Sequence, residues 1–379
     1  MPKRRVAGLI SGTSMDGLDI AIVDVEIGDP ANFALLEGKT VDFPADLQQR
    51  LRQAHAGTVG ELTLLDDDLG RFLAVSLDAY LRDVGSQLDL VGSHGQTIFH
   101  EHRRATLQIG EPSHMALTLG CPVVSDFRRA DIVAGGCGAP LAPILDKWIL
   151  SAPDKAVLAL NLGGIANFTA LPSLSDVDGK AIACDTGPSN MVMDGLVRRF
   201  TQGRQSSDLN GAFAARGQVR QAWLDEMLAD PYFQRPPPKS CGDAEFGDAF
   251  VEQWLVGFAP KSEQDWFDLL ATATELSAVT IAQAYERFVA PSRQVAIVAA
   301  SGGGVRNPEL MRRLQARFGP VPVVSTETLG LDPDLKEAIA FALMASARID
   351  GIPANIPEVT GADRQVLLGK VTEVIPREV

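Results

Sequence analysis

Cysteine is scarce in this sequence, which has four cysteines in 379 residues. They stand far apart, at Cys121, Cys137, Cys184 and Cys241, and no two of them form a C-x-x-C pair. A chain of this length does not need disulfides to hold its core together. The pattern excludes a disulfide scaffold and offers no spacing typical of a zinc site, so we expect reduced thiols.

Dense clusters of Lys and Arg are absent as well, and the formal net charge is −14. This balance excludes an extended electrostatic surface for nucleic acid or for an anionic membrane. No apolar run is long enough to span a bilayer. The basic residues 1–5 are followed by an apolar stretch, residues 6–12, that is too short and too rich in Gly for a signal peptide. We therefore expect a cytoplasmic protein that holds any anionic ligand with local groups.

The common nucleotide-binding signatures are missing: there is no Walker sequence, no G-x-G-x-x-G and no protein-kinase set. If a nucleotide binds, its site has to be built from turns. A hydrophobic share of 46% and a charged share of 22% are typical of a soluble globular enzyme. The length favours two domains. We expect one lobe over residues 1–140, with 355–379 as a candidate to complete it, and a second lobe over 141–354.

What the sequence does contain is a repeated arrangement of short apolar runs. Val6–Ile10, a turn and Leu18–Val25 predict a strand, a tight loop and a returning strand. Val157–Leu162, a glycine turn and Phe168–Leu171 predict the same arrangement in the second half. Residues 45–81 have helical spacing, and helices that alternate with strands favour an α/β sheet. The repeat hints at an internal duplication, with one α/β unit in each half.

The turn after the first strand is a candidate phosphate-binding loop. Its small residues let the backbone turn sharply and direct N–H groups at an anion. Asp16 and Asp19 are candidate Mg²⁺ ligands, because this ion prefers oxygen donors. The alternative is a plain hairpin turn, and spacing alone does not separate the two. The predicted cofactor residues here are Gly12, Thr13, Ser14, Met15, Asp16, Gly17, Leu18 and Asp19.

Two further glycine-rich turns have the same character. One contains Gly163, Gly164 and Asn167. The other contains Gly302, Gly303, Gly304 and Asn307, between a strand-like run at 295–300 and a predicted helix at 308–318. A strand–glycine–helix junction exposes amide donors to an anion. Glycine-rich turns are common singly, but three in one chain favour a bound nucleotide between the lobes.

Asp185 is the candidate catalytic residue. It follows the strand-like residues 181–184 and precedes a helical run at 191–200. A carboxylate at the end of a buried strand lies where open α/β sheets place their ligands, and it can act as a general base. The alternative is that Asp185 caps the next helix, which its position alone favours.

A last set of residues offers groups suited to a polar sugar that carries a carboxylate. These predicted substrate residues are Ser93, His94, Arg128, Asp131 and Glu337. Each has a structural alternative. A lone His in a loop often serves only hydrogen bonding, and an Arg pair beside Asp often forms surface ion pairs. Glu337 begins a predicted helix and can simply complement its N-terminus.

Six segments together resemble the anhydro-N-acetylmuramic acid kinase family, within the actin/hexokinase/Hsp70-like ATPase superfamily. They occur in the family's order along nearly the whole chain, and no single segment carries the resemblance. The segments are ISGTSMDG at 10–17, GSHGQT at 92–97, DFR at 126–128, NLGGIAN at 161–167, DTGP at 185–188 and GGG at 302–304.

The resemblance implies a fold of two RNase H-like lobes with ATP and Mg²⁺ in the cleft between them. Gly12–Asp19 would hold the phosphates, the Gly163 turn would face them, and Gly302–Asn307 would lie near the adenosine. Asp185 matches the family's catalytic aspartate, whose implied role is to take a proton from water as that water attacks the anomeric carbon. Glu337 matches a substrate-facing glutamate of the family.

The implied activity is an ATP-dependent opening and phosphorylation of 1,6-anhydro-N-acetylmuramic acid in peptidoglycan recycling, by a homodimer. Two alternatives stay open from the residues. One is a kinase for another anhydro sugar, such as levoglucosan, and a basic group that meets a substrate carboxylate would argue against it. The other is a nucleotide-gated binding or filament protein of the same superfamily, which would not need Asp185 at a sugar pocket.

Overall fold

The computed structural model describes residues 1–12, 15–237, 239–333 and 335–374. The chain divides into two compact units, Met1–Ile149 with Leu335–Val379 (unit 1) and Leu150–Asp334 (unit 2). The mixed α/β class expected from the sequence is confirmed. The boundaries differ from the expected ones: the chain enters unit 2 after Ile149, and it returns to unit 1 before α12 (Lys336–Ile349), because that helix is buried on the sheet of unit 1.

Unit 1 is built on a six-stranded sheet in the order β13-β7-β4-β1-β2-β3. Strands β1 to β3 are antiparallel neighbours, while β4 and β7 run parallel to β1. A separate hairpin is formed by β5 and β6. The strands are β1 (Lys3–Ile10), β2 (Gly17–Glu26), β3 (Asp29–Asp42), β4 (Leu90–Ser93), β5 (Gln96–Glu101), β6 (Ala105–Ile109), β7 (Val123–Ser125) and β13 (Lys370–Thr372).

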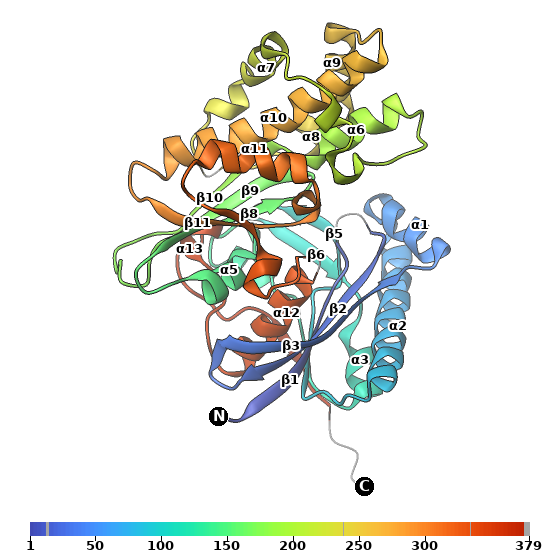
Figure 1. The fold of residues 1–379 in the computed structure, drawn as a ribbon. Helices are drawn as coiled ribbons and strands as arrows, with labels where there is room; N and C mark the ends of the chain where they lie inside the picture. Colours follow the sequence, from blue (N-terminus) through green and yellow to red (C-terminus); the bar gives the residue numbers. More distant parts are fainter. Residues whose placement is uncertain (13–14, 238, 334, 375–379) are drawn as a thin grey trace. The chain divides into compact units, whose positions relative to one another are not determined.

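Helices cover both faces of this sheet (Figure 1). On one face, Ala7 and Leu9 of β1 belong to an apolar cluster with the leucines of α2. On the other face, α12 lies against β1 and β4 so closely that a Cβ on Gly8 would come 1.8 Å from the Ala338 carbonyl oxygen. The helices are α1 (Ala45–Gln53), η1 (Ala54–Ala56), α2 (Val59–Val84), α3 (Pro112–Leu119), α4 (Arg129–Val133), α5 (Pro143–Leu150), α12 and α13 (Pro357–Thr360).

Unit 2 repeats the same strand plan. Its five-stranded sheet has the order β10-β9-β8-β11-β12, again with three antiparallel strands followed by two that run parallel to the first. This common order supports the duplication suggested by the sequence, because two unrelated sheets would not need to share order and direction. The strands are β8 (Ala156–Leu162), β9 (Ile165–Leu171), β10 (Ile182–Pro188), β11 (Val295–Ser301) and β12 (Val323–Ser325).

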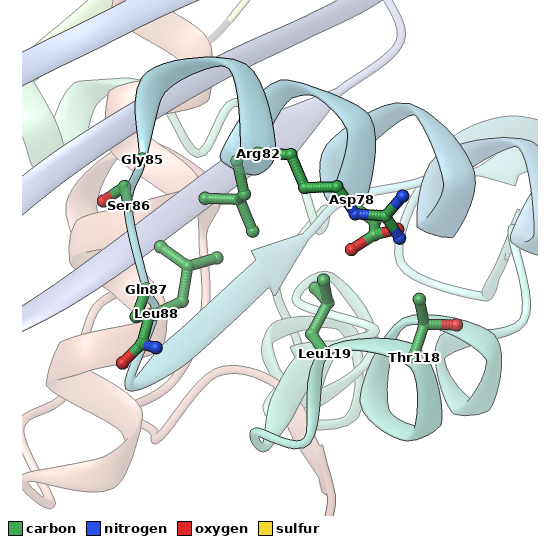
Figure 2. Close-up of a pocket in the computed structure, with 9 residues that line it drawn as sticks. Asp78, Arg82, Gly85, Ser86, Gln87, Leu88, Thr118 and Leu119 are labelled. Atoms are coloured by element: carbon green, nitrogen blue, oxygen red, sulfur yellow. The ribbon is translucent and has the colours of Figure 1, made fainter.

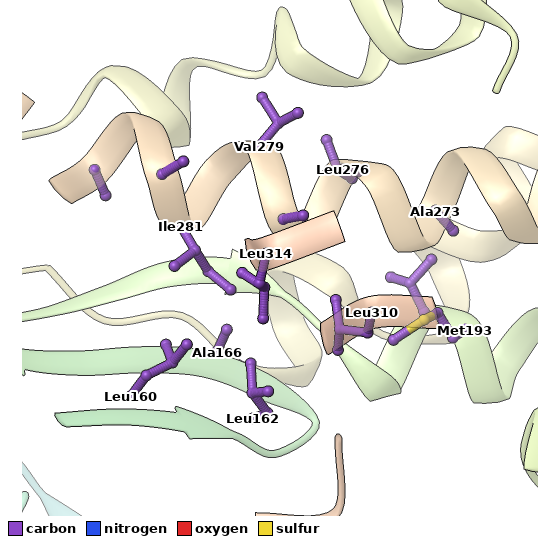
Figure 3. Packing of buried hydrophobic residues seen from close by; sticks show 14 of the residues in the cluster. Leu160, Leu162, Ala166, Met193, Ala273, Leu276, Val279, Ile281, Leu310 and Leu314 are labelled. Carbon is purple, nitrogen blue, oxygen red and sulfur yellow. The ribbon is translucent and has the colours of Figure 1, made fainter. Parts of the chain in front are cut away.

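The core of unit 2 forms where helices pack on this sheet. Figure 3 shows Leu160 and Leu162 of β8 facing Leu310 and Leu314 of α11, with α10 beyond them. The long helix α10 is buried along most of its length and carries many Ala and Thr residues, whose small side chains permit close packing. The helices are α6 (Asn190–Phe200), η2 (Leu209–Gly211), η3 (Ala214–Arg216), α7 (Gln221–Leu228), η4 (Pro231–Gln234), α8 (Asp243–Phe246), α9 (Asp248–Phe258), α10 (Glu263–Phe288), η5 (Gly303–Arg306), α11 (Pro308–Phe318) and η6 (Thr326–Leu329).

Within the described part of the chain, none of the helices combines the length and apolar character that crossing a bilayer requires.

Candidate active site

The predicted phosphate loop joins β1 to β2 in unit 1. Thr13 and Ser14 lie outside the described residues. The Met15 N–H donates to the Gly12 carbonyl (3.2 Å), and Met15 takes a left-handed φ of 54°, so the chain makes a tight turn here. Leu18 is buried in the core, so its side chain cannot contact a ligand. Among the described residues of the loop, Gly12 and Met15 are half-buried and Asp16 is exposed.

The two predicted Mg²⁺ ligands have different surroundings. Asp16 is exposed and accepts hydrogen bonds from Arg52 (3.0 Å) and from Gln48 (3.2 Å). Asp19 is half-buried and accepts one from the Thr40 hydroxyl (2.6 Å). Desolvation raises the pKa of Asp19, and the Thr40 hydrogen bond only partly opposes this. A buried carboxylate whose charge is poorly compensated fits a cation, so Asp19 suits Mg²⁺ better than Asp16, which is already paired.

The substrate candidates of unit 1 come together because β1, β4 and β7 are parallel and end at the same edge of the sheet. His94 follows β4, and Arg128 follows β7 closely. The His94 ring donates through Nδ1 to the Gly95 carbonyl (3.0 Å) and accepts at Nε2 from Arg128 Nε (3.0 Å). Burial, together with the Arg128 charge, lowers the pKa of His94 to about 3. The ring is therefore neutral at physiological pH and is not an acid catalyst.

The charges of Arg128 and Glu337 interact, and each shifts the pKa of the other. Arg128 also donates to the Gly138 carbonyl (2.9 Å), so two of its nitrogens are used within the protein. Glu337 lies in the first turn of α12, as the helix-terminus alternative expected. Glu337 is exposed at the surface of the unit, yet the protein atoms around its carboxylate raise its pKa by desolvation, and the charges of Arg128 and Lys336 oppose the shift. A glutamate with this environment can bind a polar ligand as well as complement the helix.

Asp131 and Ser93, the other two candidates, differ in how their oxygens are used. Asp131 is fully buried and accepts from Gly138 N (2.8 Å), Asn355 (2.9 Å) and the Thr360 hydroxyl (2.7 Å). It therefore belongs to the scaffold rather than to the substrate pocket. Ser93 is buried, and its hydroxyl oxygen has no hydrogen-bond partner among the described residues. Ser93 also lines a small polar hollow of about 130 Å³ with His94.

In unit 2, strand register aligns three polar side chains. Asp185 on β10 pairs with Asn167 on β9, which pairs with Asn161 on β8. Residues directly opposite in antiparallel strands point to the same face of a sheet. A Cβ on Gly302 would come 2.7 Å from the Asn161 Oδ1 atom, so the glycine turn after β11 meets this row. The sequence singled out Asp185 and Asn167, but Asn161 is identified only by the register.

Asp185 is not a helix cap. It lies within β10, and Ser189 occupies the N-cap position of α6, so the capping alternative is wrong. Its Oδ2 atom accepts from the Cys241 N–H (3.1 Å), and its carbonyl accepts from the Tyr232 hydroxyl (2.8 Å). Its own N–H donates to the Lys239 carbonyl (3.3 Å). Tyr232, Lys239 and Cys241 thus fix Asp185, which nothing in the local sequence indicated.

We expect the variant Tyr232→Phe to keep its fold and to lose part of its activity. The substitution removes only the hydroxyl that holds the Asp185 backbone, and a hydrogen bond of this kind contributes about 1 kcal/mol. The expected result is a kcat lower by about three- to tenfold with KM values nearly unchanged, measured by steady-state kinetics of ADP formation. A kcat equal to that of the unmodified chain would show that this hydrogen bond does not position Asp185.

The glycine turns of unit 2 meet one another. The Gly163 carbonyl accepts from Asn190 N (3.1 Å), and the Gly164 carbonyl accepts from Ser189 N (2.9 Å) and Met191 N (3.0 Å). The Asn190 side chain donates to the Leu162 carbonyl (3.0 Å). A Cβ on Gly304 would come 2.6 Å from Leu162 Cβ, which explains glycine at this position. Two of the predicted turns therefore form one continuous backbone surface.

Asn307, a predicted cofactor residue, also caps a helix. Its Oδ1 atom caps α11 by accepting from Glu309 N and Leu310 N, each at 3.1 Å. It also lines a hollow of about 320 Å³ in unit 2, together with Gly303. A second hollow, of about 630 Å³, lies in unit 1 where α2 and α3 end (Figure 2). Its described lining includes none of the predicted site residues.

The chain is similar to known proteins over nearly its whole length. A family model described as anhydro-N-acetylmuramic acid kinase matches residues 4–374. The chain is 38% identical to the anhydro-N-acetylmuramic acid kinase of Caldanaerobacter subterraneus subsp. tengcongensis, over 98% of this chain and 97% of the relative. The proteins of that name from Salinibacter ruber and Picosynechococcus sp. are 39% and 41% identical. They are aligned over 98% and 97% of this chain and over 96% and 99% of their own lengths, respectively.

Proposed function

This chain belongs to the anhydro-N-acetylmuramic acid kinase family, and on that basis we propose that it uses ATP to open and phosphorylate 1,6-anhydro-N-acetylmuramic acid. The products would be N-acetylmuramic acid 6-phosphate and ADP, in the reuse of cell-wall sugars. The observation that carries the proposal is Asp185, a half-buried carboxylate fixed by Cys241 and Tyr232 in the strand row with Asn161 and Asn167.

The proposed step couples hydrolysis to phosphoryl transfer. Asp185 takes a proton from a water molecule, and the water oxygen forms a bond to the anomeric carbon. The bond between that carbon and O6 breaks, and O6 keeps the electron pair. O6 then bonds to the γ-phosphorus of ATP as the bond to the β-phosphate oxygen breaks and ADP leaves. Release of strain in the bicyclic sugar favours the first bond cleavage. Much of the remaining rate acceleration would come from holding the water, the sugar and ATP in the reactive geometry.

The other residues bind and orient the reactants in this proposal. Backbone N–H groups of the predicted phosphate loop, Gly12–Asp19, would hold the phosphates. Asp19 would hold Mg²⁺, which neutralises phosphate charge when it is bound. Neutral His94, Arg128 and Glu337 would bind the sugar's polar groups. Arg128 donates through Nε to His94 and through Nη1 to Gly138, which leaves three of its five N–H groups available in the described structure.

The family also leads us to propose that the protein works as a homodimer in the cytoplasm, with no nucleic acid or membrane as a partner.

The experiment that tests the proposed chemistry is mass spectrometry of the sugar product. Hydrolytic opening followed by phosphorylation adds one phosphoryl group and one water to the anhydro sugar. Phosphorylation of an intact anhydro ring would give a product lighter by one water. We expect only the heavier product, and the lighter one would contradict the proposed role of Asp185 as the base for water.

A further inference from the structure

The hollow of about 320 Å³ in unit 2 has the size of a site for a small organic group. It lies where the first turn of α6, the segment leading into η2 and the glycine turn before α11 come together. Its lining is polar apart from Met193 and Leu209. A nucleoside fits such a space, whereas a whole nucleoside triphosphate would extend beyond it.

Two carboxylates line this hollow, and they differ in their partners. Asp208 is buried, and its two oxygens accept from Phe213 N (2.8 Å) and Ala214 N (3.0 Å), so it shapes the loop. Asp194, on α6, is half-buried, and no hydrogen bond to its carboxylate is formed by the described residues. Burial, with the nearby Asp208, raises the pKa of Asp194 to about 6, and Arg198 only partly opposes this.

Asp194 is only half-buried, so water can donate to its carboxylate, and a ligand that displaces this water has to supply donors in its place. We propose that Asp194 accepts hydrogen bonds from the ribose hydroxyls of ATP and thereby makes the enzyme specific for ribonucleotides. This inference rests on the proposed function and assigns to Asp194 the recognition of the nucleoside.

The negative charge of the two carboxylates favours the ribose of ATP, rather than its phosphates, as the group bound in the hollow. A carboxylate only accepts hydrogen bonds, and a vicinal diol offers two O–H donors to its two oxygens. Asp194 and Asp208 would repel the phosphate chain, and they outnumber Arg306, the single cation in the described lining of the hollow. The same pairing of an acidic side chain with ribose hydroxyls is used in dinucleotide-binding folds. The amino group of adenine is the other donor that ATP could present, and the experiment separates it from the ribose.

The test compares three nucleotides, ATP, 2′-deoxy-ATP and inosine triphosphate, with the unmodified protein and with Asp194→Ala. We expect the unmodified protein to have a KM for 2′-deoxy-ATP about tenfold above that for ATP, the size of one hydrogen bond to a charged acceptor. In Asp194→Ala, the KM for ATP should rise about tenfold and the ratio of the two values should fall to about one. The KM for the sugar should not change.

The matched control is Asp225→Ala, an exposed aspartate on α7 of the same unit, for which all kinetic values should stay unchanged. Asp194→Asn, which keeps the side-chain volume, replaces the alanine variant if thermal melting shows that the latter does not fold. Titration calorimetry of ATP and 2′-deoxy-ATP gives the same comparison without turnover. A lack of sugar-dependent turnover would contradict the proposed function, while calorimetry would still test the ribose contact.

Two results would overturn the inference. One is equal affinity of the unmodified protein for ATP and 2′-deoxy-ATP. The other is a preference that survives in both Asp194 variants. If inosine triphosphate instead loses affinity in the unmodified protein and not in the variants, Asp194 reads the adenine amino group rather than the ribose.

Discussion

The variant Asp185→Asn is expected to lower sugar-dependent kcat about a hundredfold to ten-thousandfold, which is the range for loss of a general base. The amide has the same shape and can still accept from the Cys241 N–H. It cannot take a proton from water at neutral pH, so the attack on the anomeric carbon loses its base. ATP binding should persist, because the nucleotide candidates lie on other segments. Steady-state ADP formation with the anhydro sugar measures the effect.

A control variant is available in the same unit. Asp178 is exposed on the connection between β9 and β10, so Asp178→Asn makes the same chemical change away from the site. It should leave kcat and both KM values unchanged. Turnover in Asp185→Asn within threefold of the unmodified enzyme would remove Asp185 from the mechanism and favour a protein that uses ATP without sugar chemistry.

The second large effect concerns Gly8, where β1 meets α12. A Cβ there would come 1.8 Å from the Ala338 carbonyl oxygen and 2.7 Å from Ala342 N, and both are backbone atoms. Neither the central strand nor the buried helix can move away without opening the core of unit 1. Overpacking usually lowers the free energy of unfolding by about 1–3 kcal/mol. We expect Gly8→Ala to lower it by at least about 3 kcal/mol. Thermal and denaturant unfolding would measure this change in the free energy of unfolding.

This substitution should also affect function, because α12 carries Glu337 one residue before Ala338. If the helix shifts, the KM for the sugar should rise more than the KM for ATP. The control is Gly60→Ala in the exposed first turns of α2, where a Cβ would meet no atom within 4 Å. That variant should be as stable as the unmodified chain or slightly more stable. A melting temperature unchanged in Gly8→Ala would contradict the packing described for α12.

Local patterns predicted the elements that hold the site. The strands beside the first turn, the strand before Gly302 and the helix Pro308–Phe318 occur where the apolar runs and the Pro at the helix start placed them. These features depend on neighbouring residues, so a sequence is sufficient to predict them. Asp185 was expected just after a strand that ends at residue 184, whereas it lies within β10, and only the structure excludes the helix cap.

The contacts that the sequence did not predict join distant segments. Asp131 looked like a ligand group, but its partners Asn355 and Thr360 come from the far end of the chain. Tyr232 reaches Asp185 from η4, which lies 47 residues further along the chain. Asn161 and Asp194 become site residues only through strand register and the closeness of separate loops. No local periodicity contains such information.

The return of the chain to unit 1 also could not be predicted from local sequence patterns. The Ala-rich sequence of α12 predicts a buried helix, but it does not say which sheet the helix covers. Gly8 and Gly92 decide this, because only glycine lets the helix backbone approach so closely. Once α12 is placed, Glu337 lies near Arg128 and Asp19, which is how a residue near the C-terminus joins a site that begins at the first strand.

The central claim is that this chain spends ATP on an anhydro amino sugar, and ADP release by the purified protein tests it most directly. The assay contains ATP and Mg²⁺ with 1,6-anhydro-N-acetylmuramic acid, levoglucosan, N-acetylmuramic acid or no sugar. We predict ADP release that is strongly stimulated by 1,6-anhydro-N-acetylmuramic acid alone. Equal stimulation by levoglucosan, or no stimulation by any sugar, would contradict the account.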